Sequence, residues 1–364
     1  MGPAAGGLAV EGVTFTRRGA RVLDSVTFNV GAGRLLAVLG PSGAGKSTLL
    51  ATLAGFERID AGTIRLHGAA IERVPTPARS VGFAFDDAAL HEHLTVADNL
   101  VSAALPRREP RERTNARVAS LAASLGIAHI LERRPGAIST GERRRVAVGR
   151  AFIRSADLVL LDEPFANLDR ANRFAIRQMI RELQRSTGAT TIVVTHDPTD
   201  ALAIADDSLV LIGGRVRAFG PALEVAAMPS DLEVAQLVDD LGMHAISVGP
   251  AGAAADCAVP DDLAARAREA GGLLLGVSPW QIAVGLAPAG ALGIRARVVA
   301  REPAGLFTDV IAVRADNRAL RARVPSTAAQ DLPIGAPADF HAPRESVHVF
   351  RGPWPGRRDS RFPA

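Results

Sequence analysis

Tyrosine is absent from this 364-residue chain, and lysine and cysteine occur once each. The single cysteine, Cys257, excludes an internal disulfide and fits a reducing compartment. Without these residue types almost nothing titrates between neutral pH and the arginines. The sequence pI of 10.5 is therefore inflated, since the formal net charge is only +4. A charge this small gives no reason to expect a nucleic-acid partner.

Long apolar helices and targeting signals are also missing. The longest uncharged stretch, residues 270–294, is long enough to span a bilayer, but it contains Pro279, Pro288, Gln281 and six glycines. That composition predicts strands and turns. No signal peptide is expected before the first strand, and position 6 lacks the Ser or Thr that myristoylation favours. The eight histidines show no metal-ligand spacing. A link to a membrane would come through a partner.

The one lysine among 42 basic residues is Lys46, inside a run that fits the pattern G-x-x-x-x-G-K-[ST]. An ammonium group on a flexible stem can lie along such a loop and reach the β- and γ-phosphates of a nucleotide, whereas a planar guanidinium cannot fold into the same space. The alternative is a glycine-rich turn with a chance lysine. We assign nucleotide binding to Gly40, Pro41, Ser42, Gly43, Ala44, Gly45, Lys46, Ser47 and Thr48.

The loop's backbone amides and the positive end of the helix expected from Lys46 favour phosphate. The Ser47 hydroxyl is a candidate Mg²⁺ ligand. A second apolar strand, residues 158–161, leads to Asp162 and Glu163. There, Asp162 can hold magnesium and Glu163 can activate a water. Alone, such a pair is more often a solvated turn, but with Lys46 in the same chain it indicates a nucleotide site.

The length predicts two or three domains. The first begins after a disordered leader at 1–7 and covers 8–243, with a helical subdomain at about 87–138. Its strands alternate with helices, which predicts an α/β fold with a parallel sheet. Expected strands are 8–13, 22–30, 35–39, 158–161 and 191–194. Expected helices are 46–53, 115–125 and 172–184. A charged link at 107–113 is expected before the second of these helices.

The character of the chain shifts after Met243. A linker is expected at 244–275, marked by small residues at 251–255 and by Pro260. Residues 276–350 alternate short strands with Gly and Pro, which predicts a compact β-barrel of roughly seventy residues. Its strands are expected at 294–299, 308–313, 321–324 and 338–341, and residues 351–364 are expected to be a disordered tail.

The segment Ile138-Ser139-Thr140-Gly141-Glu142 precedes an arginine-rich helix at 143–151. Here the chain resembles the ATP-binding cassette (ABC) family, whose signature is L-S-G-G-Q. Ser139 and Gly141 match that signature, while Thr140 and Glu142 depart from it. The resemblance runs from about residue 8 to 242, with a D-loop at 166–169 and a switch histidine, His196. We expect most of the arginines to line a solvated helix face.

Two further departures concern the nucleotide site. Asp86 stands where importer cassettes have the glutamine of the Q-loop, which would add a carboxylate to the magnesium site. The aromatic residue that stacks on adenine in the family is missing, and Arg17 or Arg18 can take its place by stacking a flat guanidinium on the base.

The resemblance implies a homodimer in which each ATP lies between the loop of one chain and the signature of the other. Lys46 and the loop amides would then bind phosphate, Ser47, Asp162 and Asp86 would surround Mg²⁺, and Glu163 would be the general base. His196 would sense the γ-phosphate. Ser139 and Gly141 would contact ATP across the dimer.

The same resemblance implies an ATPase subunit of an importer, peripheral to the cytoplasmic face of the cell membrane. Membrane permease subunits would dock near residues 82–100, with a solute-binding protein as an indirect partner. Residues from Gly276 resemble the TOBE-like barrel of importers of sugars, polyamines, ferric iron and sulfate, which can also be a dimerisation domain. The alternatives are a soluble cassette ATPase acting on DNA or the ribosome, which usually has a second cassette or an insertion, and a small-molecule kinase, which does not use residues 138–142.

Overall fold

The computed structural model describes residues 6–104 and 110–350. Contacts between Cα atoms divide the chain into two units, Met1–Met228 and Pro229–Ala364. Most of the predicted leader, residues 107–109 of the predicted charged link and the whole predicted tail lie outside the described residues. Gly6 and Gly7, which the leader was expected to include, lead directly into the first strand.

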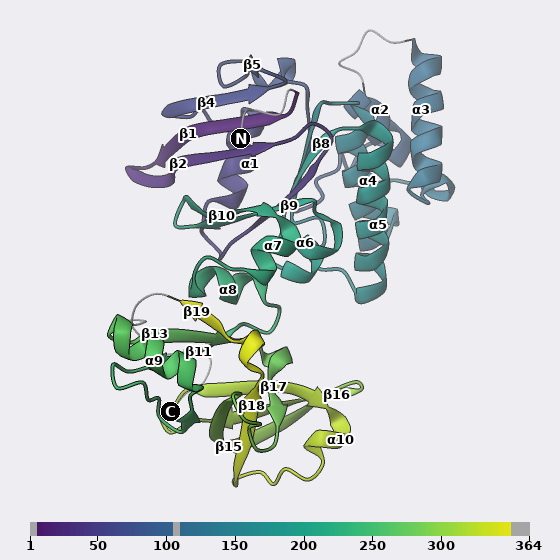
Figure 1. The fold of residues 1–364 in the computed structure, drawn as a ribbon. Helices are drawn as coiled ribbons and strands as arrows, with labels where there is room; N and C mark the ends of the chain where they lie inside the picture. Colours follow the sequence, from purple (N-terminus) through teal and green to yellow (C-terminus); the bar gives the residue numbers. More distant parts are fainter. Residues whose placement is uncertain (1–5, 105–109, 351–364) are drawn as a thin grey trace. The chain divides into compact units, whose positions relative to one another are not determined.

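A six-stranded sheet forms the centre of the first unit, in the order β10-β9-β3-β8-β7-β6. Its strands β8, β9 and β10 are labelled in Figure 1. Its parallel strands are nearly continuous apolar runs, and all five residues of β3 are buried, as expected where both faces are covered. The strands are β3 (Leu35–Leu39), β6 (Val81–Ala84), β7 (Leu158–Asp162), β8 (Thr190–Val194), β9 (Asp207–Ile212) and the antiparallel β10 (Arg215–Pro221).

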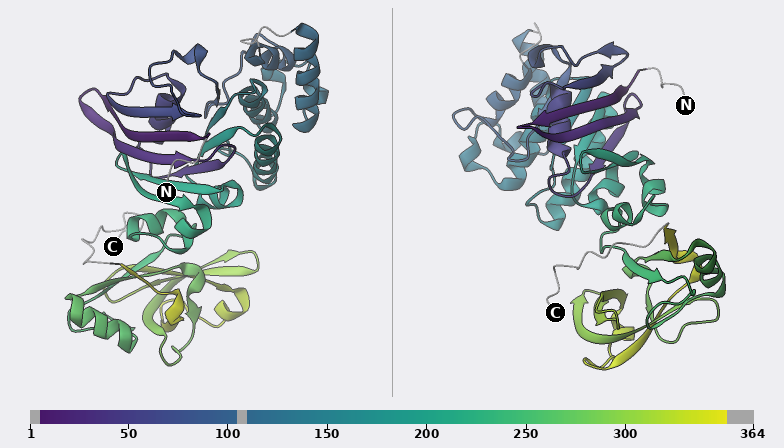
Figure 2. Two further views of the ribbon diagram at one scale, coloured as in Figure 1. Left: turned by 45° about the horizontal axis from the view of Figure 1, so that its top comes forward. Right: turned by 90° about the vertical axis from the view of Figure 1, so that its left-hand side faces the viewer.

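A second, antiparallel sheet has the order β2-β1-β4-β5. Its strands are β1 (Leu8–Arg17), β2 (Ala20–Val30), β4 (Ala61–Leu66) and β5 (Ala69–Ala70). Helix α1 (Lys46–Ala54) buries Leu49, Leu50 and Leu53 in one cluster with side chains of both sheets. Packing on two sides therefore fixes the helix that follows the glycine-rich loop, and Figure 2 shows α1 beside the antiparallel sheet.

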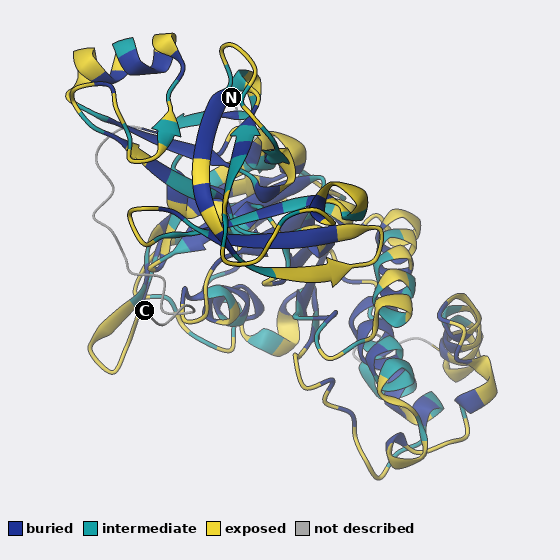
Figure 3. Ribbon diagram, turned by 90° about the horizontal axis from the view of Figure 1, so that it is seen from below, coloured by how far each residue is buried: buried dark blue, intermediate teal, exposed yellow. Residues whose placement is uncertain are grey.

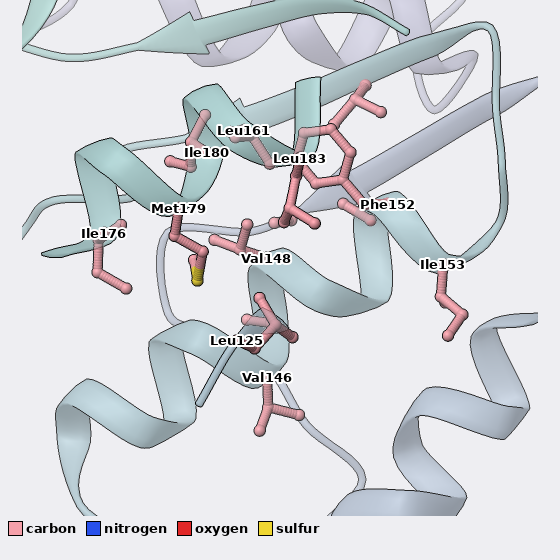
Figure 4. Packing of buried hydrophobic residues seen from close by; sticks show 14 of the residues in the cluster. Leu125, Val146, Val148, Phe152, Ile153, Leu161, Ile176, Met179, Ile180 and Leu183 are labelled. Carbon is pink, nitrogen blue, oxygen red and sulfur yellow. The ribbon is translucent and has the colours of Figure 1, made fainter. Parts of the chain in front are cut away.

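Helix α4 (Thr140–Ile153) packs against β6 and β7, and three further helices contact α4: α2 (Val96–Ala104), α3 (Arg111–Ser124) and α5 (Arg170–Thr187). In Figure 4, side chains of α4 such as Val148 and Phe152 face Met179 and Leu183 of α5. Helix α3 begins earlier than predicted, because Pro110 precedes it with an extended backbone and Glu112 favours a first turn. Shorter elements are η1 (Thr76–Ala78), η2 (Ala128–Ile130), η3 (Pro135–Ala137), α6 (Pro198–Ile204) and α7 (Ala222–Ala227).

The second unit contains two antiparallel sheets, β11-β13-β19 and β14-β18-β15-β16-β17, and β12 pairs with β15. The end strands β14 and β17 contact each other, which makes the larger sheet barrel-like. Its elements are α8 (Leu232–Val238), β11 (His244–Val248), β12 (Cys257–Ala258), α9 (Asp261–Ala270), β13 (Leu273–Val277), η4 (Pro279–Gln281), β14 (Ala283–Val284), β15 (Leu292–Ala304), β16 (Phe307–Val313), β17 (Ala319–Pro325), α10 (Ser326–Ala329), β18 (Pro337–Ala342), η5 (Arg344–Ser346) and β19 (His348–Phe350).

Residues 244–275 carry β11, α9 and the start of β13, where the sequence predicted a linker. Ile246, Leu263 and Ala267 are fully buried in the core cluster of this unit. The alanine-rich composition hid an amphipathic helix that follows Pro260 and has two aspartates in its first turn. Figure 3 shows buried residues along the strands and exposed residues on turns and outer helix faces. Among the described residues, no helix is both long and apolar enough to cross a membrane.

Candidate functional site

The loop from Gly40 to Gly45 connects β3 to α1 and depends on its glycines. A Cβ atom at Gly40 would lie 2.2 Å from the carbonyl oxygen of Leu211, so no larger residue fits. Gly45 adopts φ 101° and caps α1 without a side-chain hydrogen bond. No side chain therefore caps the first-turn amides of α1, and these N–H groups can donate hydrogen bonds to an anion.

The ammonium group of Lys46 lies over this loop. Its Nζ donates to the carbonyl oxygens of Gly40 at 2.7 Å and Pro41 at 3.0 Å. Burial lowers the pKa of Lys46, and the negative charges of Glu163 and Asp162 partly oppose that shift. The side chain is thus folded back along the loop, next to the two carboxylates predicted from the sequence.

Asp162 lies at the carboxyl end of β7 and meets the start of α1. The Ser47 hydroxyl donates to its Oδ1 at 3.3 Å. Burial raises the pKa of Asp162; the charges of Glu163 and Asp86 add to the shift, while the bond from Ser47 opposes it. Two oxygen donors that lie this close are the kind of ligands that Mg²⁺ prefers.

Glu163 follows directly and has a positive φ of 46°, which is uncommon for a residue with a side chain. Its backbone amide donates to Val194 of the neighbouring strand β8 at 3.0 Å. That strand leads to His196, whose Nδ1 is 2.9 Å from Glu163 Oε2. Residues distant in sequence, Lys46, Asp162, Glu163 and His196, therefore converge at one edge of the sheet.

The predicted signature residues lie at the start of α4. Ser139 is the N-cap, and Glu142 completes a capping box with it. Gly141 lies close to α5, because a Cβ atom added there would be 3.1 Å from Asn172 Oδ1. Asn172 in turn bonds to Asp169, the N-cap of α5 at the end of the predicted D-loop. Among the described residues, no hydrogen bond or ion pair joins Ser139 or Gly141 to the loop at 40–48.

Asp86 lies just beyond β6, and its side chain is 63% exposed. Its carboxylate is 4.0 Å from a guanidinium nitrogen of Arg144, which is itself 7% exposed. Arg144 also donates to the backbone carbonyls of Phe85, Asp86 and Ala166, at 3.4, 2.6 and 3.5 Å. One buried cation thus joins the Asp86 loop, the D-loop and the helix that follows the signature.

The expectation that the arginines of α4 line a solvated face is wrong. Four of them donate to backbone carbonyls of other segments: Arg143 to Pro135, Arg144 to Asp86, Arg145 to Leu125, and Arg150 to Ala89. Backbone carbonyls without regular partners accept readily from guanidinium groups, which offer several donors in a fixed plane. The arginine run therefore ties α4 to the segments around it.

Comparisons with known proteins identify the family. A family model described as "ABC transporter" matches residues 23–166. The sn-glycerol-3-phosphate import ATP-binding protein of Rhodopseudomonas palustris is 34% identical over 351 residues, 91% of this chain and 93% of that protein. The chain belongs to the ATP-binding subunits of ABC importers. It binds and hydrolyses ATP to energise solute uptake.

Two further ABC proteins are similar over part of the chain. The protein of the same name from Chromohalobacter salexigens is 40% identical over 230 residues, which is 63% of this chain and 62% of that protein. The solved structure of cbiO1 from Clostridium perfringens, part of the ABC transporter complex cbiONQ, has a TM-score of 0.55 at 26% identity. The match covers 61% of this chain and 90% of the cbiO1 chain.

An ion-pair network that the sequence analysis missed lies beside His196, the predicted switch histidine. Asp200 on α6 is 1% exposed, and its carboxylate is 3.4 Å from Arg173 and from Arg177 of α5. Arg173 also pairs with Asp197. Burial raises the pKa of Asp200 to about 6, with Asp197 adding to the shift and the arginines opposing it. The only available sequence signal was the spacing of Asp197 and Asp200 after His196.

Of the two arginines considered for adenine stacking in this ABC subunit, Arg17 is already engaged. It donates to Glu57 at 2.7 Å, and its guanidinium carbon lies 5.6 Å from the centre of the Phe15 ring. Arg18 occupies the exposed turn between β1 and β2 with φ 51°.

A groove of about 370 Å³ opens beside the Asp86 loop. Phe56, Phe83 and Phe85 contribute to its wall with ring centroids 4.4 to 5.6 Å apart. Phe56 and Phe85 are about half exposed. Arg150 of α4 and Arg154, the residue that follows α4, also line the groove, so it combines aromatic surface with positive charge.

Proposed function

We propose that this importer ATPase hydrolyses ATP at the sheet edge where Lys46, Asp162, Glu163 and His196 converge. The observation that carries the proposal is the contact of His196 with Glu163. Glu163 follows Asp162 in the sequence, and Asp162 in turn accepts a hydrogen bond from Ser47. In this proposal Lys46 leaves its loop carbonyls to neutralise the β- and γ-phosphates. Glu163 accepts a proton from the attacking water, and His196 orients Glu163 and contacts the γ-phosphate.

The donor set near the phosphate loop fits Mg²⁺. Ser47 and Asp162 would hold the ion, with Asp86 close enough to contribute to the electrostatics of Asp162. When bound, the ion would neutralise charge that develops on the phosphate oxygens. The protein's own contribution is to hold the Asp162 carboxylate at the end of a buried strand.

We propose that the working unit is a homodimer. Within the described residues no hydrogen bond or ion pair joins the predicted signature to the phosphate loop of this chain, whereas both would be needed to enclose one nucleotide. Two copies arranged head to tail would each lend Ser139 and Gly141 to the ATP bound at the other's Lys46. Thr48 and the other loop residues would complete each site from the first copy.

The groove beside Asp86 fits a short segment of a membrane permease subunit. Its wall is aromatic, and Arg150 and Arg154 favour an acidic or carbonyl-rich partner segment. In this proposal the docking surface overlaps the predicted region, residues 82–100, and the subunit works at the cytoplasmic face of the membrane. A solute-binding protein would act upstream of the permease.

For the second unit we propose a regulatory or dimerisation role. The larger sheet of the second unit is formed by strands of the TOBE-like region, residues 276–350, together with β12. The cassette would lie wholly within residues 8–243. Every residue assigned to nucleotide binding precedes Met228.

Hydrolysis by Glu163→Gln tests the proposal. We expect this variant to bind ATP normally and to hydrolyse it about 10²–10⁴-fold more slowly, which is the usual contribution of a general base. Lys46→Ala should lose ATPase activity altogether. Glu182→Gln, which removes an equivalent charge from an exposed position on α5, is the matched control. A normal rate for Glu163→Gln would remove Glu163 from the mechanism.

A further inference from the structure

The carboxylate of Glu142 occupies hydrogen-bond donors at the start of α4. The backbone amide and the hydroxyl of Ser139 both donate to Glu142 Oε2, each at 2.8 Å. The amide of Glu142 donates back to Ser139 Oγ at 3.3 Å. These bonds lower the pKa of the Glu142 carboxyl, the one from the Ser139 amide being the largest cause. The start of this helix therefore already holds an anion.

The second carboxylate oxygen of Glu142 has a different partner. His129 Nε2, on the short helix η2, lies 3.2 Å from Glu142 Oε1. The His129 side chain is 63% exposed and that of Glu142 is 24% exposed. Glu142 thus lies between two partners, with one oxygen on Ser139 and the other on His129. If the Ser139 contact is broken, the carboxylate keeps a hydrogen-bonding partner.

We infer that Glu142 is an internal competitor of ATP for the signature serine. The inference rests on the proposed function, in which Ser139 contacts the ATP bound to a second copy. A phosphate of that ATP would need the same donors that Glu142 now holds, and two anions at one helix start repel each other. Closure of the ATP-bound dimer therefore requires the Glu142 carboxylate to leave Ser139 and remain with His129.

Glutamine at position 142 separates the charge of this side chain from its capping role. Its carbonyl oxygen can still accept from the Ser139 amide, so the capping box is retained. It carries no negative charge, and its amide N–H can donate to a phosphate. A purely structural role for Glu142 predicts that Glu142→Gln behaves like the parent protein. Competition with ATP predicts a tighter ATP-bound dimer.

The experiment measures the ATP concentration for half-maximal dimer formation by sedimentation, using the full-length Glu163→Gln protein so that ATP persists. We expect Glu142→Gln in this background to lower that concentration about tenfold, the effect of removing a like charge at hydrogen-bond range. Glu132→Gln removes the same charge from an exposed position in the same subdomain and should change nothing. His129→Ala, which removes the second partner, should raise the concentration several-fold.

The outcomes distinguish this inference from the proposed function. If neither the Glu163→Gln parent nor any variant dimerises at saturating ATP, the proposed head-to-tail dimer is wrong, and the inference is lost with it. If the parent dimerises and Glu142→Gln needs the same or a higher ATP concentration, Glu142 is only a helix cap and the inference is overturned. If Glu142→Gln does not fold, an unchanged midpoint for His129→Ala overturns it.

Discussion

Arg144 holds three segments of the nucleotide site with one guanidinium group. Its bonds to the carbonyls of Phe85, Asp86 and Ala166 place the Asp86 loop and the D-loop on a common anchor. Because the group is buried, the nearby Asp86 carboxylate gives it a compensating charge. This pairing provides a physical reason why an acidic residue is tolerated at position 86.

Substitution of Asp86 tests that electrostatic arrangement. Burial is the main cause of the raised pKa of Asp162, and the charge of Asp86 adds to it. In the proposed mechanism Asp162 must be ionised to hold Mg²⁺. Asp86→Gln should therefore increase basal ATPase activity several-fold and extend it to lower pH. ATPase rates from pH 6 to 9 would be compared with those of wild type and of the control variant Asp87→Asn. In the wild type the Asp87 carboxylate accepts a hydrogen bond from the Ala89 amide instead. Superimposable profiles for Asp86→Gln and wild type would show that Asp86 does not affect the site.

Asp200 makes the stability of the first unit depend on pH. Its pKa in the folded chain is about 6, against 3.8 for an ordinary aspartate side chain. Because the folded-state pKa is raised, the stability linked to its protonated form is present below about pH 4 and lost as pH rises through 6. The difference corresponds to roughly 3 kcal/mol, since one pKa unit is about 1.4 kcal/mol.

Asp200→Asn should remove this dependence. Relative to wild type, the variant should gain roughly 2–3 kcal/mol in unfolding free energy between pH 4 and pH 8. Hydrogen exchange of amides in β8 and α5 measures the change within the first unit. Asp60→Asn, at an exposed position, is the control. Parallel pH dependences for wild type and Asp200→Asn would contradict the prediction.

At the scale of elements, strong local patterns were sufficient for part of the fold. The apolar run of β3 and the helix from Lys46 were predicted with little error, because a buried strand, a glycine-rich loop and a terminal Gly55 are all local signals. Helix α9 was missed because its alanines gave no clear period, and Pro260 suggested a linker rather than a helix start.

The partners of charged side chains could not be predicted in the same way. Arg144 and Asp86 are 58 residues apart in sequence, and nothing local marks them as neighbours. The arginine run therefore resembled a solvated face, although its carbonyl partners lie on segments that only the folded chain brings together. The same holds for Asp200, whose two arginines come from α5. Motifs marked residues that converge at one edge of the sheet, but they gave no signal for the contacts that support those residues.

For the whole molecule, each unit has its own core. Met243 packs with Leu274 and Phe350 in the second unit, together with Leu232 of α8. The contact boundary at Met228 therefore precedes the cassette end at residue 243 that the sequence suggested. A cut after Met243 would leave α8 without the side chains that cover it.

A chain ending at Met228 should fold and bind ATP with little change, but dimerise less well than the full protein. ATP binding should persist because every residue assigned to phosphate binding lies in the first unit. Dimerisation should weaken because the proposed dimerisation role belongs to the second unit. Equilibrium dialysis would measure ATP binding, and sedimentation would measure self-association. A chain ending at Met243, with the apolar face of α8 exposed, should aggregate more. A folded Met228 chain without ATP affinity would assign part of the nucleotide site to the second unit.

The solitary lysine makes this protein unusually simple to label. Apart from the α-amino group, Lys46 offers the chain's only primary amine, and burial lowers its pKa, so that the reactive neutral form is more populated at a given pH. An acylating reagent would therefore attach at one side chain, held over the loop by Gly40 and Pro41. The stoichiometry of that modification, read by mass spectrometry, becomes a direct count of vacant nucleotide sites, without any engineered tag.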